Sequence, residues 1–196
     1  MSSWGAVEGS ESLPKFLTTA QQKDVFANQS GWVVEAGSAM TGNGNTSADP
    51  EILVAIGGLA GASGTTGLGE ATINTVDWNI TTFDKSAGGT LSVTVRYNET
   101  VTVAVSNPTI IVTNDQRANH TLTYASGTGT HELTFTLVIA AADSATNAGD
   151  VLSVAAQSIV LASSSTIKDT SDTPANAELA ISSAQGTACG TVTVVA

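Results

Sequence analysis

Hydrophobic and polar residues alternate with a period of two along much of the chain from residue 71 onward. In the clearest stretch the apolar positions are Leu91, Val93, Val95 and Tyr97. Side chains on a strand point alternately to the two faces of a sheet, so these four are expected to face a core. The polar residues between them are expected to face solvent. The same period continues over residues 101–105, after a turn predicted at residues 98–99.

A hairpin and two later strands follow from the same pattern. Leu122 and Tyr124 precede the turn residues 126–129, and the strand after the turn has a core-facing set of Leu133, Phe135, Leu137 and Ile139. A further strand begins at residues 152–154. Ile159 and Leu161 fall on the other parity, which predicts a bulge before them. The last strand is predicted at residues 191–195. Short strands of even spacing joined by turn residues favour a β-sandwich over residues 71–196.

Residues 1–48 lack this period and are expected to form an extended, mostly irregular arm. They hold two of the three tryptophans and two of the four phenylalanines, followed by a run rich in Gly and Asn. One short helix is predicted at residues 20–26, capped by Thr18 or Thr19. The arm is expected to be too short and irregular to bury its own aromatic residues, so it either mediates assembly with a neighbouring subunit or folds back on its own domain.

Residues 49–70 are expected to link the arm to the sandwich. The apolar run at residues 51–59 is long enough for one strand, and the glycine-rich stretch after it is read as a loop or linker. Two glycine pairs, at residues 42 and 44 and at residues 67 and 69, resemble pieces of a phosphate-binding loop. Neither completes the G-x-G-x-x-G motif nor precedes a helical pattern, which argues against nucleotide binding.

The charge of the chain limits the kinds of molecule that it is expected to bind. Only 12% of residues are charged, and six Lys and Arg stand against seventeen Asp and Glu, for a net charge of −11. Such a surface repels nucleic acid and is suited to docking on a basic surface or to solubility. No window approaches 18 apolar residues, so no membrane span is expected. The start of the chain lacks the features of a signal peptide, and we expect synthesis and retention of the N-terminus in a cytosol.

Few residues could do chemistry, and we expect no enzyme and no cofactor. His120 and His131 lie at opposite ends of the predicted hairpin arms and are read as a surface cross-strand pair. Zinc would need more nitrogen or sulfur ligands than the chain offers. Cys189 is read as a small apolar residue in a late strand. Calcium is the better metal candidate, but two loops rich in Asp and Asn, at residues 143–150 and 169–176, are read as solvated turns.

Three segments together resemble bacterial immunoglobulin-like repeats of the kind found in adhesins and phage surface proteins. They are TLSVTVRYNETVTVAVSNPTIIVTND from residue 90, TLTYASGTGTHELTFTLVIAAADS from residue 121 and DVLSVAAQSIVLASSSTIKDTSD from residue 150. The resemblance covers roughly residues 71–181 and implies an immunoglobulin-like β-sandwich. The ASSS at residues 162–165 departs from the family pattern, which has a glycine pair before TIKD.

The N-terminal segment gives a second resemblance. Trp4-Gly-Ala, followed by Pro14-Lys-Phe-Leu, is similar to the start of small virion structural proteins of tailed phages, particularly those of cyanobacterial and marine hosts. The two resemblances together imply a capsid decoration protein that stabilises the outer face of the virion. The expected partners are the major capsid protein and neighbouring copies of this chain in a homo-oligomer. The expected interface residues are Trp4, Phe16, Leu17, Phe26 and Trp32.

Two alternatives stay open at this point. The first is a neck, tail or fibre component of the virion. The second is an adhesion module that binds carbohydrate or a cell surface, which an exposed cluster of aromatic residues on the sandwich would favour.

Overall fold

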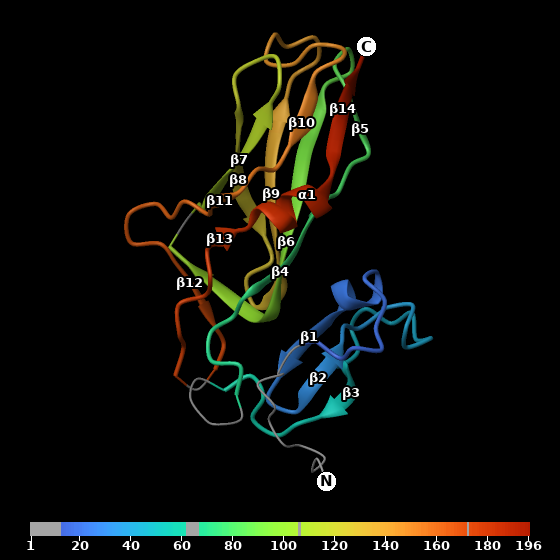
Figure 1. Ribbon diagram of the computed structural model, residues 1–196, viewed down its shortest axis with the longest axis vertical. Coiled ribbons are helices and arrows are strands. Elements are labelled where there is room, and N and C mark those ends of the chain that lie inside the picture. The colour runs from blue at the N-terminus through green and yellow to red at the C-terminus, as the bar shows by residue number, and fades with distance from the viewer. Residues whose placement is uncertain (1–12, 62–66, 106, 172) are drawn as a thin grey trace.

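A computed structural model describes residues 13–61, 67–105, 107–171 and 173–196, and in these residues the chain is almost entirely β-structure (Figure 1). A small group of three strands lies at one end of the molecule, and the C-terminus lies at the other. The three are β1 (Val25–Asn28), β2 (Gly31–Val34) and β3 (Glu51–Ala55), preceded by a 3₁₀ helix at Gln21–Asp24.

The larger group of strands forms the main sheet. Its members are β4 (Ile73–Trp78), β5 (Thr82–Asp84), β6 (Gly89–Ala104), β7 (Thr109–Asn114), β8 (His120–Ser126), β9 (Thr130–Ile139), β10 (Val151–Ser153), β12 (Thr166–Asp169) and β14 (Thr191–Val195). Two short strands, β11 (Gln157–Ser158) and β13 (Ala180–Ile181), pair separately. The one α-helix among the described residues, α1 (Ser183–Cys189), precedes the last strand.

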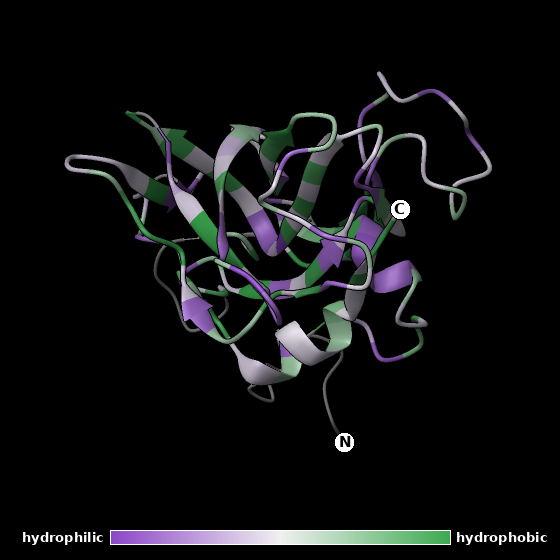
Figure 2. Cartoon of the chain, turned by 90° about the horizontal axis from the view of Figure 1, so that it is seen from above, coloured by the Kyte–Doolittle hydropathy of each residue, from purple (hydrophilic) through white to green (hydrophobic). Residues whose placement is uncertain are grey.

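The main sheet folds over one hydrophobic core. Its hydrogen-bonded order is β4-β6-β9-β8-β7-β10-β14-β5, and β12 also pairs with β6. The pairs in this path are antiparallel except β14 with β5, which is parallel. The core residues come from all of these strands, and the largest that are fully buried are Tyr97 and Phe135. The alternation that predicted the strands is visible as bands of hydrophobic and hydrophilic residues along them (Figure 2).

Strand β6 is longer than the sequence predicts, and the turn expected at residues 98–99 is wrong. Asn98 and Glu99 lie inside one strand of 16 residues and are buried. The side-chain oxygen of Asn98 accepts a hydrogen bond from the backbone N–H of Thr72 at 2.7 Å. The pairing of β6 with β9 shifts register between Arg96 and Val101. A register shift of this kind bends a strand without ending it. The strand therefore continues through the polar residues Asn98 and Glu99.

The described residues 13–61 contain three strands. Strands β1 and β2 lie in the expected arm, whose described residues 13–48 are otherwise mostly irregular, and β3 lies in the run at residues 51–59 where one strand was expected. Strands β1, β2 and β3 form an antiparallel sheet with its own core, so residues 13–61 are here called the N-terminal unit. Its buried members are Leu17, Val25, Ala27, Trp32, Val34, Leu59 and Ala60. Strand β3, which follows the boundary expected between residues 48 and 49, pairs with β2 before it. A single parallel bridge from Ala27 to Glu99 joins this sheet to β6.

The chain leaves the main sheet after β10, where a bulge was expected. The side chain of Gln157 occupies the place of a strand partner: its Nε2 donates to the carbonyl of Ile111 at 2.7 Å, and its Oε1 accepts from the N–H of Ile111 at 2.6 Å. The ASSS turn retains a glycine-like backbone, since Ser164 has a φ of 71°. Cys189 is the last residue of α1. It was expected in a late strand, and that prediction is wrong.

Candidate functional site

The structure divides the expected interface residues into buried and exposed groups. Leu17, Phe26 and Trp32 are 7%, 6% and 2% exposed, and all three pack inside the protein. These three are not available as surface anchors, because the N-terminal unit uses them for its own packing and for its contact with β9. Phe16, in contrast, is 68% exposed. Trp4 lies outside the described residues.

Phe16 borders an apolar groove on the N-terminal unit. The groove has a volume of about 370 Å³, and its walls are Leu13, Pro14, Lys15, Phe16, Trp32, Val54 and Ile56. Six of these seven side chains are apolar, and Lys15 is the one charged group. Phe16 and Trp32 are both among the expected interface residues, and they meet here although only one of them is exposed.

Strand β3 forms one end of the sheet order and has no neighbour on its outer side among the described residues. Ile52, in the middle of this strand, is 58% exposed. An edge strand with exposed apolar residues offers unpaired N–H and C=O groups to another chain. The groove and this edge together are called the docking face below.

A chain of ion pairs connects the N-terminal unit to the main sheet. Lys23 Nζ lies 2.5 Å from Asp77 Oδ1, and Arg96 Nη1 lies 2.7 Å from Asp77 Oδ2. Arg96 also donates through Nε to Glu132 Oε1 at 2.5 Å. The Lys23–Asp77 pair crosses between the two parts, whereas the two pairs of Arg96 lie within the main sheet.

His131 lies at the same junction. Its ring stacks on that of Phe26, with centroids 4.5 Å apart. Nε2 is 3.3 Å from the carbonyl oxygen of Lys23 and 3.7 Å from Glu35 Oε2. Burial lowers the pKa of His131, and burial together with nearby Glu132 and Asp24 raises the pKa of Glu35 to about 7. A cavity of about 440 Å³ opens beside both residues.

The two histidines do not form a cross-strand pair. His120 lies at the start of β8 and pairs with Val112 of β7, whereas His131 lies at the start of β9. Because β8 and β9 run antiparallel, their starts lie at opposite ends of the hairpin. Burial lowers the pKa of His120 as well. The ladder that was expected to bring the two imidazoles together therefore separates them.

Carboxylates of both calcium-candidate loops already have partners within the protein. Asp150 Oδ2 accepts from the Asn114 side chain at 2.9 Å and from the N–H of Asn147 at 2.8 Å, with Arg117 Nε 3.3 Å away. Asp169 Oδ1 accepts from both the N–H and the hydroxyl of Ser171. The hydrogen bonds to neighbouring backbone groups are those of turn residues. Asp150 and Asp169 are only 2% and 1% exposed, however, so the expectation that they are solvated is wrong.

Glu99, which was expected in a turn, is a buried carboxylate in strand β6. Glu99 is 1% exposed, and its Oε1 has no hydrogen-bond partner among the described residues. Burial, and after it the charge of Asp169, raise the pKa of Glu99 to about 7. This side chain is therefore destabilised in its charged form.

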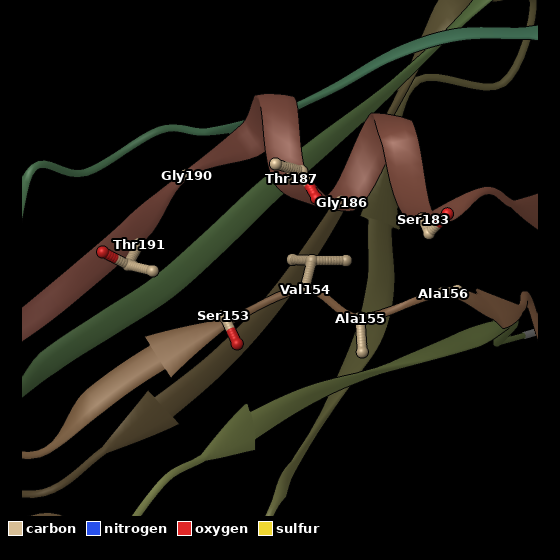
Figure 3. Close-up of a pocket in the computed structure, with 9 residues that line it drawn as sticks. All are labelled: Ser153, Val154, Ala155, Ala156, Ser183, Gly186, Thr187, Gly190 and Thr191. Atoms are coloured by element: carbon tan, nitrogen blue, oxygen red, sulfur yellow. The ribbon is translucent and has the colours of Figure 1, made fainter.

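A second cavity lies between α1 and β10 and is lined by small residues (Figure 3). Its volume is about 380 Å³. Its side chains are those of Ser153, Val154, Ala155, Ala156, Ser183, Thr187 and Thr191, with Gly186 and Gly190. A Cβ on Gly186 would lie 2.4 Å from the carbonyl oxygen of Val154, so the helix packs against this strand only because the residue is glycine. No ionisable group lines this cavity, and its tight walls are explained by packing.

Sequence reasoning did not find the junction. Arg96 and Glu132 belong to the polar sets of their strands and were read as facing solvent. Their alternation gave the correct face of the sheet, but the N-terminal unit that covers this end of it was not expected to fold. Glu35 and Asp77 carried no signal at all, because only the tertiary contact brings them together.

No family model, no curated protein and no solved structure matches this chain. Within the described part of the chain, no helix combines the length and apolar character needed to cross a bilayer.

Proposed function

We propose that this protein is a non-catalytic structural component of a phage virion that decorates the outer surface of the capsid. In this proposal the main sheet is an immunoglobulin-like sandwich and the N-terminal unit carries the docking face. The resemblances of residues 71–181 and of the N-terminal segment support the class of protein. The docking face supports the mode of action.

The strand order supports the immunoglobulin-like assignment. Taken in chain order, β4 to β10 and then β14, leaving out the short β11 to β13, correspond to strands A, A′, B, C, D, E, F and G. The observed path then divides into A-B-E-D and C-F-G-A′. The constant-type immunoglobulin sandwich has strands ABED in one sheet and CFG in the other. The direct pairing of β7 with β8 joins the two halves at one side.

The observation that carries the proposed mode of binding is the exposure of Phe16 beside an apolar groove and a free strand edge. A side chain of this size that is 68% exposed contributes little to its own fold. Aromatic residues that enter a partner's pocket commonly dominate the affinity of an interface. The proposed partner is the major capsid protein. The net charge of −11 favours a partner whose surface is basic overall.

The adhesion alternative finds no support in the aromatic residues of the main sheet. Phe83, Tyr97 and Phe135 are buried in its core, and Tyr124 and Trp78 are partly buried against it. Trp78 also donates through Nε1 to the carbonyl of Gly190 at 3.3 Å. The exposed aromatic cluster that carbohydrate binding would favour is not formed by these five residues.

The test uses point variants of the full chain, because removing residues 1–32 would delete β1 and open the core of the N-terminal unit. Phe16→Asp and Ile52→Lys are mixed separately with undecorated particles of the parent phage, and binding is measured by co-sedimentation. Each variant is expected to weaken binding roughly tenfold or more. Val138→Asp is the matched control, since Val138 is 75% exposed but lies near the far end of β9.

Unchanged binding by both docking-face variants would contradict the proposed mode of binding. Loss of binding by Val138→Asp alone would move the interface to the main sheet. Thermal unfolding of each variant checks that the fold is intact.

A further inference from the structure

We propose that Glu35, His131 and Glu132 bind one divalent transition-metal ion, with zinc as the reference member of the class, across the junction between the N-terminal unit and the main sheet. One ligand atom from each residue can be chosen so that all three lie within 4.8 Å of one another. Glu35 directly follows β2, whereas His131 and Glu132 belong to β9. A bound ion would therefore connect the two parts of the molecule.

The geometry is close to that of a bound state. Zinc ligands lie about 2.0–2.2 Å from the ion, so ligand atoms around it are roughly 3–4 Å apart. His131 Nε2 and Glu35 Oε2 already stand 3.7 Å apart. The side chains of Glu35 and Glu132 are 35% and 33% exposed, which leaves them room to rotate toward an ion. Arg96 Nε holds Glu132 Oε1 at 2.5 Å and acts as the outer partner that orients this carboxylate.

The charged side chains around the site carry an excess of two negative charges, which one divalent ion would neutralise. The carboxylates of Asp24, Glu35, Asp77 and Glu132 surround the junction, and the cations that face them are Lys23 and Arg96. Two negative charges remain when His131 is neutral.

The donor set favours a transition metal over calcium or magnesium. Calcium and magnesium take oxygen ligands, whereas an imidazole nitrogen beside two carboxylates suits zinc and its neighbours. The sequence offered too few nitrogen and sulfur ligands for a structural zinc site of four side chains. Three protein ligands with one open position need only one histidine. The cavity of about 440 Å³ beside Glu35 and His131 supplies the route for solvent and the ion.

Binding requires one tautomer of His131. Nε2 must present its lone pair to the ion, so the ring proton must lie on Nδ1. In the other tautomer Nε2 donates to the carbonyl of Lys23, which lies 3.3 Å away. Metal binding is therefore expected to break this one contact and leave the stacking on Phe26 in place.

The first test uses nuclear magnetic resonance of the two imidazoles, because the chain contains only two histidines. Zinc is added to the ¹⁵N-labelled, chelator-treated full-length protein. The ring signals of His131 are expected to shift to those of a metal-bound neutral imidazole, with saturation at one ion per chain. His120 is the internal control at the other end of the hairpin and should not move. Unmoved His131 signals, or equal shifts of both rings, would overturn the proposal.

The second test is calorimetric titration of zinc into variants. Glu35→Gln and Glu132→Gln keep the size of each side chain and should each weaken the affinity at least about tenfold. Glu51→Gln, on exposed β3, is the matched control and should bind like the unaltered chain. Calcium should bind more weakly than zinc. Equal zinc affinity in all three variants would show that the ion binds elsewhere and would contradict the assignment.

Discussion

Replacing Glu99 by glutamine should stabilise the protein at alkaline pH and have little effect at acidic pH. Glu99 is almost fully buried, its Oε1 has no partner among the described residues, and its pKa is raised from 4.5 to about 7. Between these two values the folded chain holds a proton that the unfolded chain has released. The free energy of unfolding therefore falls as pH rises from about 4.5, and the loss is complete above about 7.

The magnitude follows from the size of the shift. At about 1.4 kcal/mol for each pKa unit, the penalty on the charged form is roughly 3 kcal/mol, and the neutral amide of Glu99→Gln does not bear it. For a protein of this length that corresponds to a rise in melting temperature of roughly 6–12 °C at pH 8. Glutamine has nearly the same shape, so the variant and the unaltered protein should melt within a few degrees of each other at pH 4.5.

The assay is urea unfolding of both proteins at pH 4.5 and pH 8. Comparing the two proteins at each pH cancels the contribution of Glu35, which titrates in both. Glu51→Gln, on the exposed edge strand, is the control for changing one surface charge and should leave the difference near zero. A stability difference between Glu99→Gln and the unaltered chain that is the same at both pH values would refute the reasoning.

Three further predictions concern the N-terminal unit and the turns. Trp32→Ala should lower the free energy of unfolding by about 3–5 kcal/mol, because it leaves a cavity in the core of a small unit. Phe16→Ala should change it by less than about 0.5 kcal/mol, because Phe16 is exposed. Urea unfolding of the two variants measures both values. Ser164→Gly should raise the melting temperature slightly, since the left-handed backbone with φ of 71° costs a residue with a side chain about 1 kcal/mol, and a lower melting temperature would contradict this. Gln157→Ala should cost about 1–3 kcal/mol, because both polar groups of Ile111 lose their partner, and hydrogen exchange at the Ile111 amide should accelerate.

The strands of the main sheet could be predicted because their information is local. The period of two identified the core-facing residues of β6 and β9 correctly, including Leu91 and Leu133, which are fully buried. The turn expected at residues 98–99 failed because Asn98 and Glu99 are polar residues in a buried strand. Asn98 is held by the backbone of Thr72, a contact 26 residues away that no local pattern contains.

The N-terminal unit could not be predicted in the same way, since its core is assembled from separated residues. Leu17, Trp32 and Leu59 share no period, and they meet only after three short strands have paired. The consequence for the interface residues was direct: aromatic residues that looked unpartnered were partners of one another or of β9, as in the stacking of Phe26 on His131.

Helix α1 was missed although its start carried a signal. Ser182 and Gln185 form a capping box, in which each side chain bonds the backbone of the other residue. The seven residues that follow the cap include Gly186 and Thr187, which are weak helix formers, and the last of them, Cys189, was expected in a strand. The packing of Gly186 against Val154 supplies the stability that the local sequence lacks.

The most direct test of the central proposal is the number of copies that bind one undecorated particle of the parent phage, measured from the mass of saturated particles. Decoration of the capsid surface predicts hundreds of copies per particle, with binding reduced by Phe16→Asp. A few copies per particle would assign the protein to the neck or tail. No binding at all would contradict the proposal that this chain is a virion component.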